Sequence, residues 1–200
     1  AACRTADAMF AVPRCTDVTF IPRMLELSAA EKVDLVVPTI DTELSALAAA
    51  QNRFAAIGTR VHVSSPELVG IARDKLRTAA FFAEQGISSP RTLPLAELLD
   101  RPEALRYPLV LKRIDGSSSI GLHMVDSVEA LRRLDLEPQR YIAQEKWIGR
   151  EYTVNQFYDQ HGLLRASVPH LRREVRAGEV SKGVTERHPL LMAIAERIGA

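Results

Sequence analysis

The pattern of apolar and polar positions predicts alternating short strands and helices in the first third of the chain. A continuous apolar run at 33–39 predicts a buried strand, and apolar residues at helical spacing predict a helix over 41–54. A second strand is expected at 60–64, and the pair beginning at Ser65 is typical of a helix start because proline is favoured at the first helical position. Strands and helices that alternate in this way favour a parallel α/β layer.

The pattern changes in the middle of the chain. A long helix is expected over 71–86, and the stretch 86–102 is richer in proline and serine, so we expect the main domain boundary in or before it. The following elements form a predicted β-loop-β-helix unit: a strand at 107–113, a polar glycine loop at 114–121, a strand at 122–125 and a helix capped by Ser127.

Strand-forming residues dominate the last third. Strands are expected at 141–147 and 151–159, with a hairpin turn at 161–162, a second hairpin over 172–183 and a final helix from Pro189. Together these elements predict a fold class that combines α/β with α+β.

Composition and charge narrow the class of protein. The chain is 46% hydrophobic and 26% charged, so it can bury a core. Its net charge of +1 and the lack of a basic cluster argue against nucleic-acid binding. No apolar run approaches the roughly 20 residues that span a bilayer, and Cys3 and Cys15 suggest neither a disulfide framework nor a zinc site. We therefore expect a cytoplasmic protein without a membrane partner.

The loop from Asp115 to Gly121 is the first candidate site. Its backbone amides and three serine hydroxyls could surround a polyphosphate, and Lys112 places an ammonium at the end of the preceding strand. A plain hairpin turn and a surface lysine are the alternative. The loop has neither the Walker arrangement nor the dinucleotide-binding G-x-G-x-x-G pattern.

The segment from Gln144 to Glu151 is the second candidate. Its carboxylates interrupt an apolar strand pattern, and such acids cost desolvation energy unless they meet hydrogen-bond donors. An adenine amino group and ribose hydroxyls are donors of this kind. The alternative is a solvated strand edge.

The order of these segments resembles the ATP-grasp superfamily of carboxylate-amine ligases, and in particular proteins similar to the large subunit of carbamoyl phosphate synthase. The resemblance begins near VDLVVPTIDTELSALA, continues through RDKLRTAAFFAEQGISSPRT and YPLVLKRIDGSSSIG, and runs past QEKWIGREYTV to PHLRREVRAGEVSKGVT. It implies a partial Rossmann-like pre-ATP-grasp domain at 1–72, followed by two α+β lobes that grip ATP, an N-terminal lobe at 73–140 and a partial C-terminal lobe at 141–200.

The resemblance also implies roles for single residues. Lys75 and Lys112 would contact the phosphates, Glu145 would accept the adenine amino group, and Glu151 would hold the ribose. Asp74 is interpreted as a helix cap. The full set of expected nucleotide contacts is Lys75, Lys112, Gly116, Ser117, Ser118, Ser119, Gly121, Glu145, Lys146, Ile148 and Glu151.

Cations on the last predicted hairpin could face the γ-phosphate or a substrate carboxylate. Arg172 is the preferred catalytic candidate because its PHLRR context resembles the family's substrate-side arginine; Arg173, Arg176 and Lys182 accompany it. A solvated charged face is the alternative.

The implied reaction forms an acyl phosphate from a carboxylate and ATP, then joins it to an amine or ammonia and releases ADP. Mg²⁺ is expected as a cofactor, with carboxylate ligands beyond residue 200, so no metal ligand is assigned within the chain and the chain alone is expected to be inactive. The family's opening strand should precede Ala1, and a homodimer is compatible with the resemblance. A noncatalytic ATP-binding regulatory module stays an alternative, whereas a Rossmann oxidoreductase would require the absent G-x-G-x-x-G.

Overall fold

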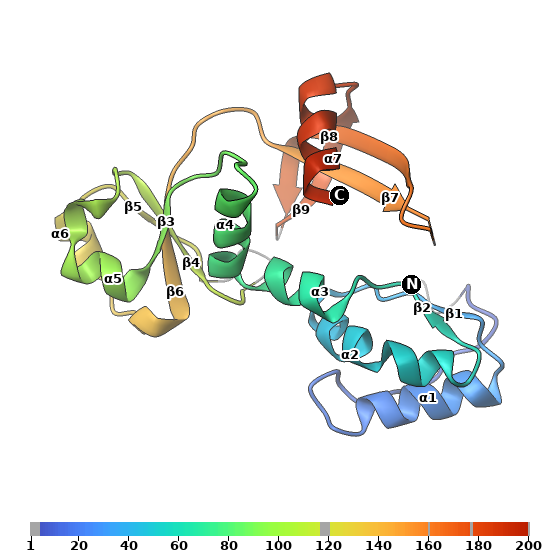
Figure 1. Ribbon diagram of the computed structural model, residues 1–200. Coiled ribbons are helices and arrows are strands. Elements are labelled where there is room, and N and C mark those ends of the chain that lie inside the picture. The colour runs from blue at the N-terminus through green and yellow to red at the C-terminus, as the bar shows by residue number, and fades with distance from the viewer. Residues whose placement is uncertain (1–4, 117–120, 160, 177, 200) are drawn as a thin grey trace. The chain divides into compact units, whose positions relative to one another are not determined.

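The computed structural model describes residues 5–116, 121–159, 161–176 and 178–199 (Figure 1). The chain divides into two compact units, Ala1–Ala72 and Arg73–Ala200. The architecture mixes helices with parallel and antiparallel sheets, which confirms the predicted combination of α/β and α+β. Within the described ranges, no helix has both the length and the apolar character required to cross a membrane.

The first unit is a small α/β layer. Its elements are α1 (Phe20–Ala30), β1 (Leu35–Val36), the short 3₁₀ helix η2 (Asp41–Glu43), α2 (Leu44–Ala55), β2 (Arg60–Val61) and α3 (Pro66–Arg73), which runs to its boundary. Strands β1 and β2 pair in parallel, with α2 between them in sequence. Phe20 of α1 packs with Leu47 and Phe54 of α2 in one buried cluster.

The prediction of a buried strand at 33–39 is wrong in its length and in its burial. Only Leu35 and Val36 form β1, and Leu35 and Val37 are 49% and 54% exposed. Among the described residues the sheet has two strands, so no further strand covers the outer edge or broadens the buried face. The predicted strand at 60–64 is likewise reduced to Arg60–Val61, and α1 was not predicted.

The second unit begins with a four-stranded antiparallel sheet in the order β3-β6-β4-β5. Its elements are α4 (Lys75–Glu84), β3 (Thr92–Pro94), α5 (Leu95–Asp100), η3 (Pro102–Ala104), β4 (Leu109–Arg113), β5 (His123–Val125), α6 (Val128–Arg132), η4 (Pro138–Arg140) and β6 (Tyr141–Glu145). The predicted β-loop-β-helix unit is present as β4, β5 and α6.

Alternation along β4 decides which side chains reach the core of this sheet. Leu109 and Leu111 are fully buried and belong to one cluster with Leu98 of α5 and Leu131 of α6. Because successive side chains in a strand point to opposite faces, Lys112 lies on the other face. The candidate ammonium is therefore presented away from the apolar core.

The proline-rich stretch 86–102 contributes to this core. It forms β3 and α5, neither of which the sequence pattern predicted, and Leu95 and Leu98 are buried. Strand β6 forms hydrogen bonds with β3 and β4. The four-stranded sheet therefore extends to Glu145, five residues beyond the lobe boundary expected at 140.

The helix predicted over 71–86 is divided at Asp74. This residue has an extended backbone, and its carboxylate accepts hydrogen bonds from the amides of Leu76 (2.8 Å) and Arg77 (3.1 Å). These are the bonds of an N-terminal cap, which satisfies amides that lack partners within the helix. The interpretation of Asp74 as a cap is confirmed, and it makes Lys75 the first residue of α4.

The remaining sheet is an antiparallel meander, β7-β8-β9, followed by α7. Its elements are β7 (Tyr152–Tyr158), β8 (Leu164–Arg176), β9 (Glu179–Thr185) and α7 (Pro189–Gly199), which packs on β8 and β7. Gly162 and Gly178 have positive φ at the two turns, as the predicted hairpins require.

Candidate functional site

Lys112 is held in a chain of polar contacts across the four-stranded sheet β3-β6-β4-β5. Its Nζ donates a hydrogen bond to Oε1 of Gln144 (2.8 Å), and Nε2 of Gln144 donates to the hydroxyl of Thr92 (2.9 Å). Burial lowers the pKa of the Lys112 ammonium, and the carboxylate of Glu151 partly opposes this effect. The result is a partly buried cation with one neutral acceptor, which an anionic ligand would stabilise.

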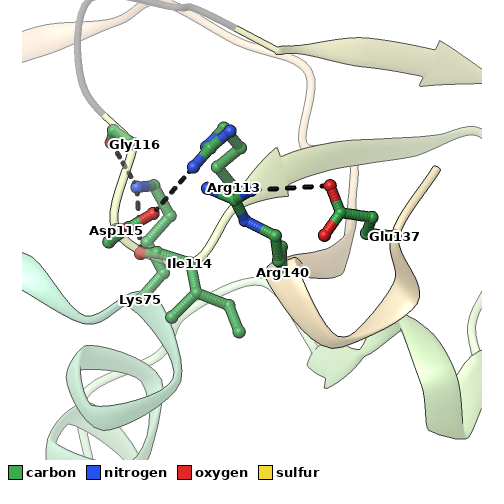
Figure 2. Close-up of polar contacts among 7 residues, drawn as sticks. All are labelled: Lys75, Arg113, Ile114, Asp115, Gly116, Glu137 and Arg140. Atoms are coloured by element: carbon green, nitrogen blue, oxygen red, sulfur yellow. Dashed lines mark hydrogen bonds and ion pairs between the residues drawn. The ribbon is translucent and has the colours of Figure 1, made fainter.

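Lys75 lies against the start of the glycine loop. Figure 2 shows its ammonium pointing toward two backbone carbonyls, with Nζ donating to the oxygen of Gly116 (2.6 Å) and to that of Ile114 (3.3 Å). The backbone amide of Lys75 also donates to the Ile114 carbonyl (3.2 Å). The structure therefore joins the beginning of α4 to the loop after β4.

The loop itself is described at its two ends. Gly116 follows β4, and Gly121 has a φ of +72°, a conformation that favours glycine. The expected phosphate contacts Ser117, Ser118 and Ser119 lie outside the described residues.

Glu145 ends β6 with its carboxylate largely buried. Its Oε1 accepts a hydrogen bond from the amide of Arg106 (3.0 Å) and lies 3.8 Å from Nη1 of Arg91. A carboxylate offers about four lone-pair positions, so these contacts leave capacity for another donor. This arrangement supports the expectation that Glu145 accepts a ligand hydrogen bond.

The segment after β6 is exposed. Ile148 is 91% exposed and Trp147 is 59% exposed, and Lys146 is also exposed. Apolar side chains this open can cover a planar ligand, and Lys146 and Ile148 remain predicted contacts of the base.

Arg172 of β8 and Glu151, which precedes β7, form an ion pair. Nη1 of Arg172 lies 3.2 Å from Oε1 of Glu151, and Nη2 donates to the carbonyl of Gly178 (2.7 Å). Nε of Arg172 is buried and has no hydrogen-bond partner in the part of the chain that the structure describes. A buried donor of this kind calls for an acceptor, which a ligand could supply.

The other hairpin cations are more exposed than Arg172. Lys182 donates to Glu174 (2.9 Å) in an exposed pair, and Arg173 and Arg176 are also exposed. Exposed pairs of this type contribute little energy. The assignment of Arg172 as the catalytic candidate stays a prediction.

Gln144 begins the second candidate segment but was assigned no contact of its own, and Thr92 was not predicted as part of the site. The period-two pattern of 141–147 places Gln144 on the same face as Ile142, but which neighbour it meets depends on strand pairing. Thr92 lies in a segment with no strand signal. Only the sheet register brings both residues to Lys112.

The described residues contain no group of three or more His, Cys, Asp or Glu side chains that could hold a metal ion. Oδ1 of Asp115 lies 3.7 Å from Nη2 of Arg113 (Figure 2).

Family models match both units of the chain. A PylC-like N-terminal domain matches residues 1–62, and an ATP-grasp domain matches residues 72–199. The ATP-grasp match covers more than half of the chain, so the family resemblance is confirmed.

Curated relatives are D-alanine–D-alanine ligases. The protein from Ectopseudomonas mendocina is 41% identical over 91 residues, which cover 42% of this chain and 29% of the relative. The protein from Chromohalobacter salexigens is 28% identical over 161 residues, 77% of this chain and 48% of the relative. The chain thus spans less than half the length of these relatives.

Solved structures share the fold at low identity. The biotin carboxylase domain of the Hydrogenobacter thermophilus 2-oxoglutarate carboxylase, described with MgADP and bicarbonate, has a TM-score of 0.73 at 15% identity, covering 98% of this chain and 50% of that one. The L-amino acid ligase from Bacillus licheniformis has a TM-score of 0.62 at 18% identity, covering 94% and 46%. Because the ATP-grasp domain is matched over 72–199, more than half of its length, the chain belongs to the ATP-grasp family.

Proposed function

We propose that this chain binds ATP and belongs to a carboxylate-amine ligase that releases ADP. The observation that carries the proposal is the Lys112 ammonium, partly buried near the end of β4, which leads into the glycine loop, with Gln144 as its hydrogen-bond partner. A cation in this position gains most from a ligand that brings negative charge. The ATP-grasp family match supports ATP as that ligand.

Each part of ATP has a proposed partner among the residues of this chain. Lys112 and Lys75 bind the phosphates, and Lys75 also fixes the carbonyls at the start of the loop. Glu145 accepts the adenine amino group while keeping its bond from Arg106. Lys146 and Ile148 contact the base, and Ser117, Ser118 and Ser119 add phosphate contacts.

The sheet β7-β8-β9 and the residue before it supply the groups proposed to bind the ribose and the substrate. Glu151 accepts from the ribose hydroxyls through the oxygen capacity left by its pair with Arg172. Arg172 binds a substrate carboxylate, for which the fork of a guanidinium is suited. Its buried Nε has no hydrogen-bond partner among the residues that the structure describes, which supports this role because a ligand oxygen would satisfy it.

The proposed reaction has two displacements. A carboxylate oxygen of the substrate attacks the γ-phosphorus of ATP, the bond from that phosphorus to the bridging oxygen breaks, and ADP leaves with the electron pair. An amine then attacks the carbonyl carbon of the acyl phosphate, phosphate leaves, and the amine loses a proton as the C–N bond forms. Mg²⁺, when bound to the nucleotide, would neutralise phosphate charge; its ligands remain a prediction beyond residue 200.

Amino acids are the proposed substrate class. The curated relatives are named for joining two D-alanines, and one fold relative is named for acting on L-amino acids. An amino acid carries the carboxylate that Arg172 would bind and the amine that completes the reaction.

Hydroxylamine trapping tests the proposed reaction in the full-length protein. With ATP, Mg²⁺ and one amino acid at a time, an acyl phosphate reacts with hydroxylamine to give a hydroxamate, and one ADP is released for each. We expect hydroxamate with at least one amino acid and its loss in the Arg172→Ala protein. ATP binding without hydroxamate or ADP for any carboxylate tested would contradict the ligase and leave an ATP-binding module.

A further inference from the structure

Arg113 follows Lys112 in β4 but points to the opposite face of the sheet. Its register partner on β6 is Tyr141, a member of the buried core cluster. The side chain of Arg113 therefore continues the row of Leu109 and Leu111 to the end of the strand, where the glycine loop begins.

The stem of Arg113 contacts the loop at its first glycine. A methyl group added to Gly116 would lie 2.8 Å from Cβ of Arg113. That separation is too short for two carbon atoms, and Cβ is fixed to the backbone and cannot swing away. Gly116 is thus packed directly on Arg113.

The same stem contacts the loop at its last glycine. A methyl group on Gly121 would lie 3.2 Å from Cδ and 3.3 Å from Cγ of Arg113, and 3.0 Å from the hydroxyl of Tyr141. One side chain therefore lies against both ends of the segment that carries the three serines. The two contacts use Cβ, Cγ and Cδ, which are the aliphatic part of the arginine.

The guanidinium group of Arg113 has a different environment. It lies 3.7 Å from the exposed Asp115 carboxylate, and the residue borders a cavity of about 350 Å³ that Arg140 and Glu137 also line. In Figure 2 the Arg113–Asp115 contact and the Lys75 contacts lie on the same short turn. Lys75 holds the carbonyl of Gly116 while the arginine stem supports the glycine from the core side.

We propose that Arg113 is a positioning residue for the phosphate-binding loop, acting through its aliphatic stem on Gly116 and Gly121. The proposal rests on the proposed ATP-binding function and adds a residue that does not itself touch the nucleotide. Pre-ordering the two ends of the loop reduces the entropic cost of ATP binding, since groups that are already held in place lose less freedom when the ligand binds. Arg113 should therefore matter for the phosphates and not for the base.

Three substitutions separate the stem from the charge. Arg113→Ala removes both, Arg113→Met keeps a long aliphatic stem without the charge, and Arg140→Ala removes a neighbouring positive charge at the same cavity while leaving both glycine contacts intact. The dissociation constants of ATP and adenosine are measured for each full chain by competition against a fluorescent ATP analogue. Adenosine lacks phosphates, so a general loss of structure would weaken both ligands.

We expect Arg113→Ala to weaken ATP binding about ten-fold and to change adenosine binding by no more than about two-fold. In Arg113→Met, ATP affinity should return to within about three-fold of wild type, and in Arg140→Ala it should be unchanged. Equal ATP affinity in Arg113→Ala and wild type would overturn the inference. So would a loss in Arg113→Met as large as in Arg113→Ala, because charge would then be responsible, or a parallel loss of adenosine. A wild-type chain that binds no ATP would instead overturn the proposed function on which the inference rests.

Discussion

Lys112 and Gln144 occupy diagonal positions on the neighbouring antiparallel strands β4 and β6, and Nζ of Lys112 donates a hydrogen bond to Oε1 of Gln144 over 2.8 Å. The other end of the Gln144 amide donates to Thr92 on β3, whose hydroxyl in turn donates to the carbonyl of Pro90. Three strands thus fix the direction of one ammonium group.

Removing the Thr92 hydroxyl should loosen this chain and weaken ATP binding. In Thr92→Val the Gln144 amide loses its acceptor, and a hydrogen bond of this kind contributes about 0.5 to 1.5 kcal/mol. We expect ATP affinity to fall about three-fold in a calorimetric titration, whereas Thr92→Ser, which keeps the hydroxyl, should resemble wild type. Equal affinities for the Val and Ser proteins would show that the chain does not position Lys112.

ATP affinity should decrease in alkaline solution because of Lys112. Burial holds the pKa of its ammonium below the ordinary value of 10.5 in the free protein, and bound phosphates would raise that pKa again because they favour the charged form. ATP affinity is therefore highest below the lowered pKa of Lys112 in the free protein. It falls as the pH rises through that pKa toward the higher pKa of Lys112 in the complex.

Titrations at several pH values check this dependence against Lys112→Arg. A guanidinium stays charged throughout this range, so the substitution should remove the alkaline decrease even if it changes the affinity itself. A decrease of the same size in Lys112→Arg would assign it to another group.

Loss of the Asp74 cap should destabilise the unit that carries Lys75. Asp74→Ala leaves the amides of Leu76 and Arg77 without their side-chain acceptor, and loss of a cap costs about 1 kcal/mol. Asp74→Asn keeps an acceptor oxygen and serves as the control. Urea unfolding should separate Ala from Asn by about that amount, and coincident midpoints would contradict the capping role.

Two glycines should respond differently to alanine. Gly121 has a φ of +72° and close neighbours, whereas a methyl group on Gly149 meets no atom within 4 Å and its φ lies outside the left-handed region. Gly121→Ala should cost about 1 to 2 kcal/mol for the left-handed backbone alone, and Gly149→Ala should change the free energy of unfolding by less than about 0.5 kcal/mol. Equal unfolding midpoints in urea would refute the strained geometry at Gly121.

Local signals in the sequence were sufficient for much of the second unit. The alternation of 107–113, the glycine loop and the Ser127 cap predicted β4, β5 and α6, and the side chain of Ser127 does accept a bond from the amide of Ala130. These elements are set by neighbouring residues and need no knowledge of distant contacts. Asp74 was identified for the same reason.

Features set by distant contacts were missed. Helix α5 lies in a proline-rich stretch that reads as a linker, and it becomes helical with Leu95 and Leu98 buried against the sheet. The Lys112–Gln144 bond joins residues 32 positions apart, and the contact of Arg113 with Gly121 depends on the pairing of β4 with β5. Strand register and loop packing, not residue type, decide these contacts.

Calorimetric titration of ATP into wild type and Lys112→Ala tests the central claim most directly. A charge-assisted bond contributes about 1.5 to 3 kcal/mol, and 1.4 kcal/mol corresponds to ten-fold in affinity. We predict that the wild-type chain binds ATP and that Lys112→Ala binds it at least about ten-fold more weakly. No heat of binding for wild type, or the same dissociation constant for both proteins, would contradict ATP binding at this site.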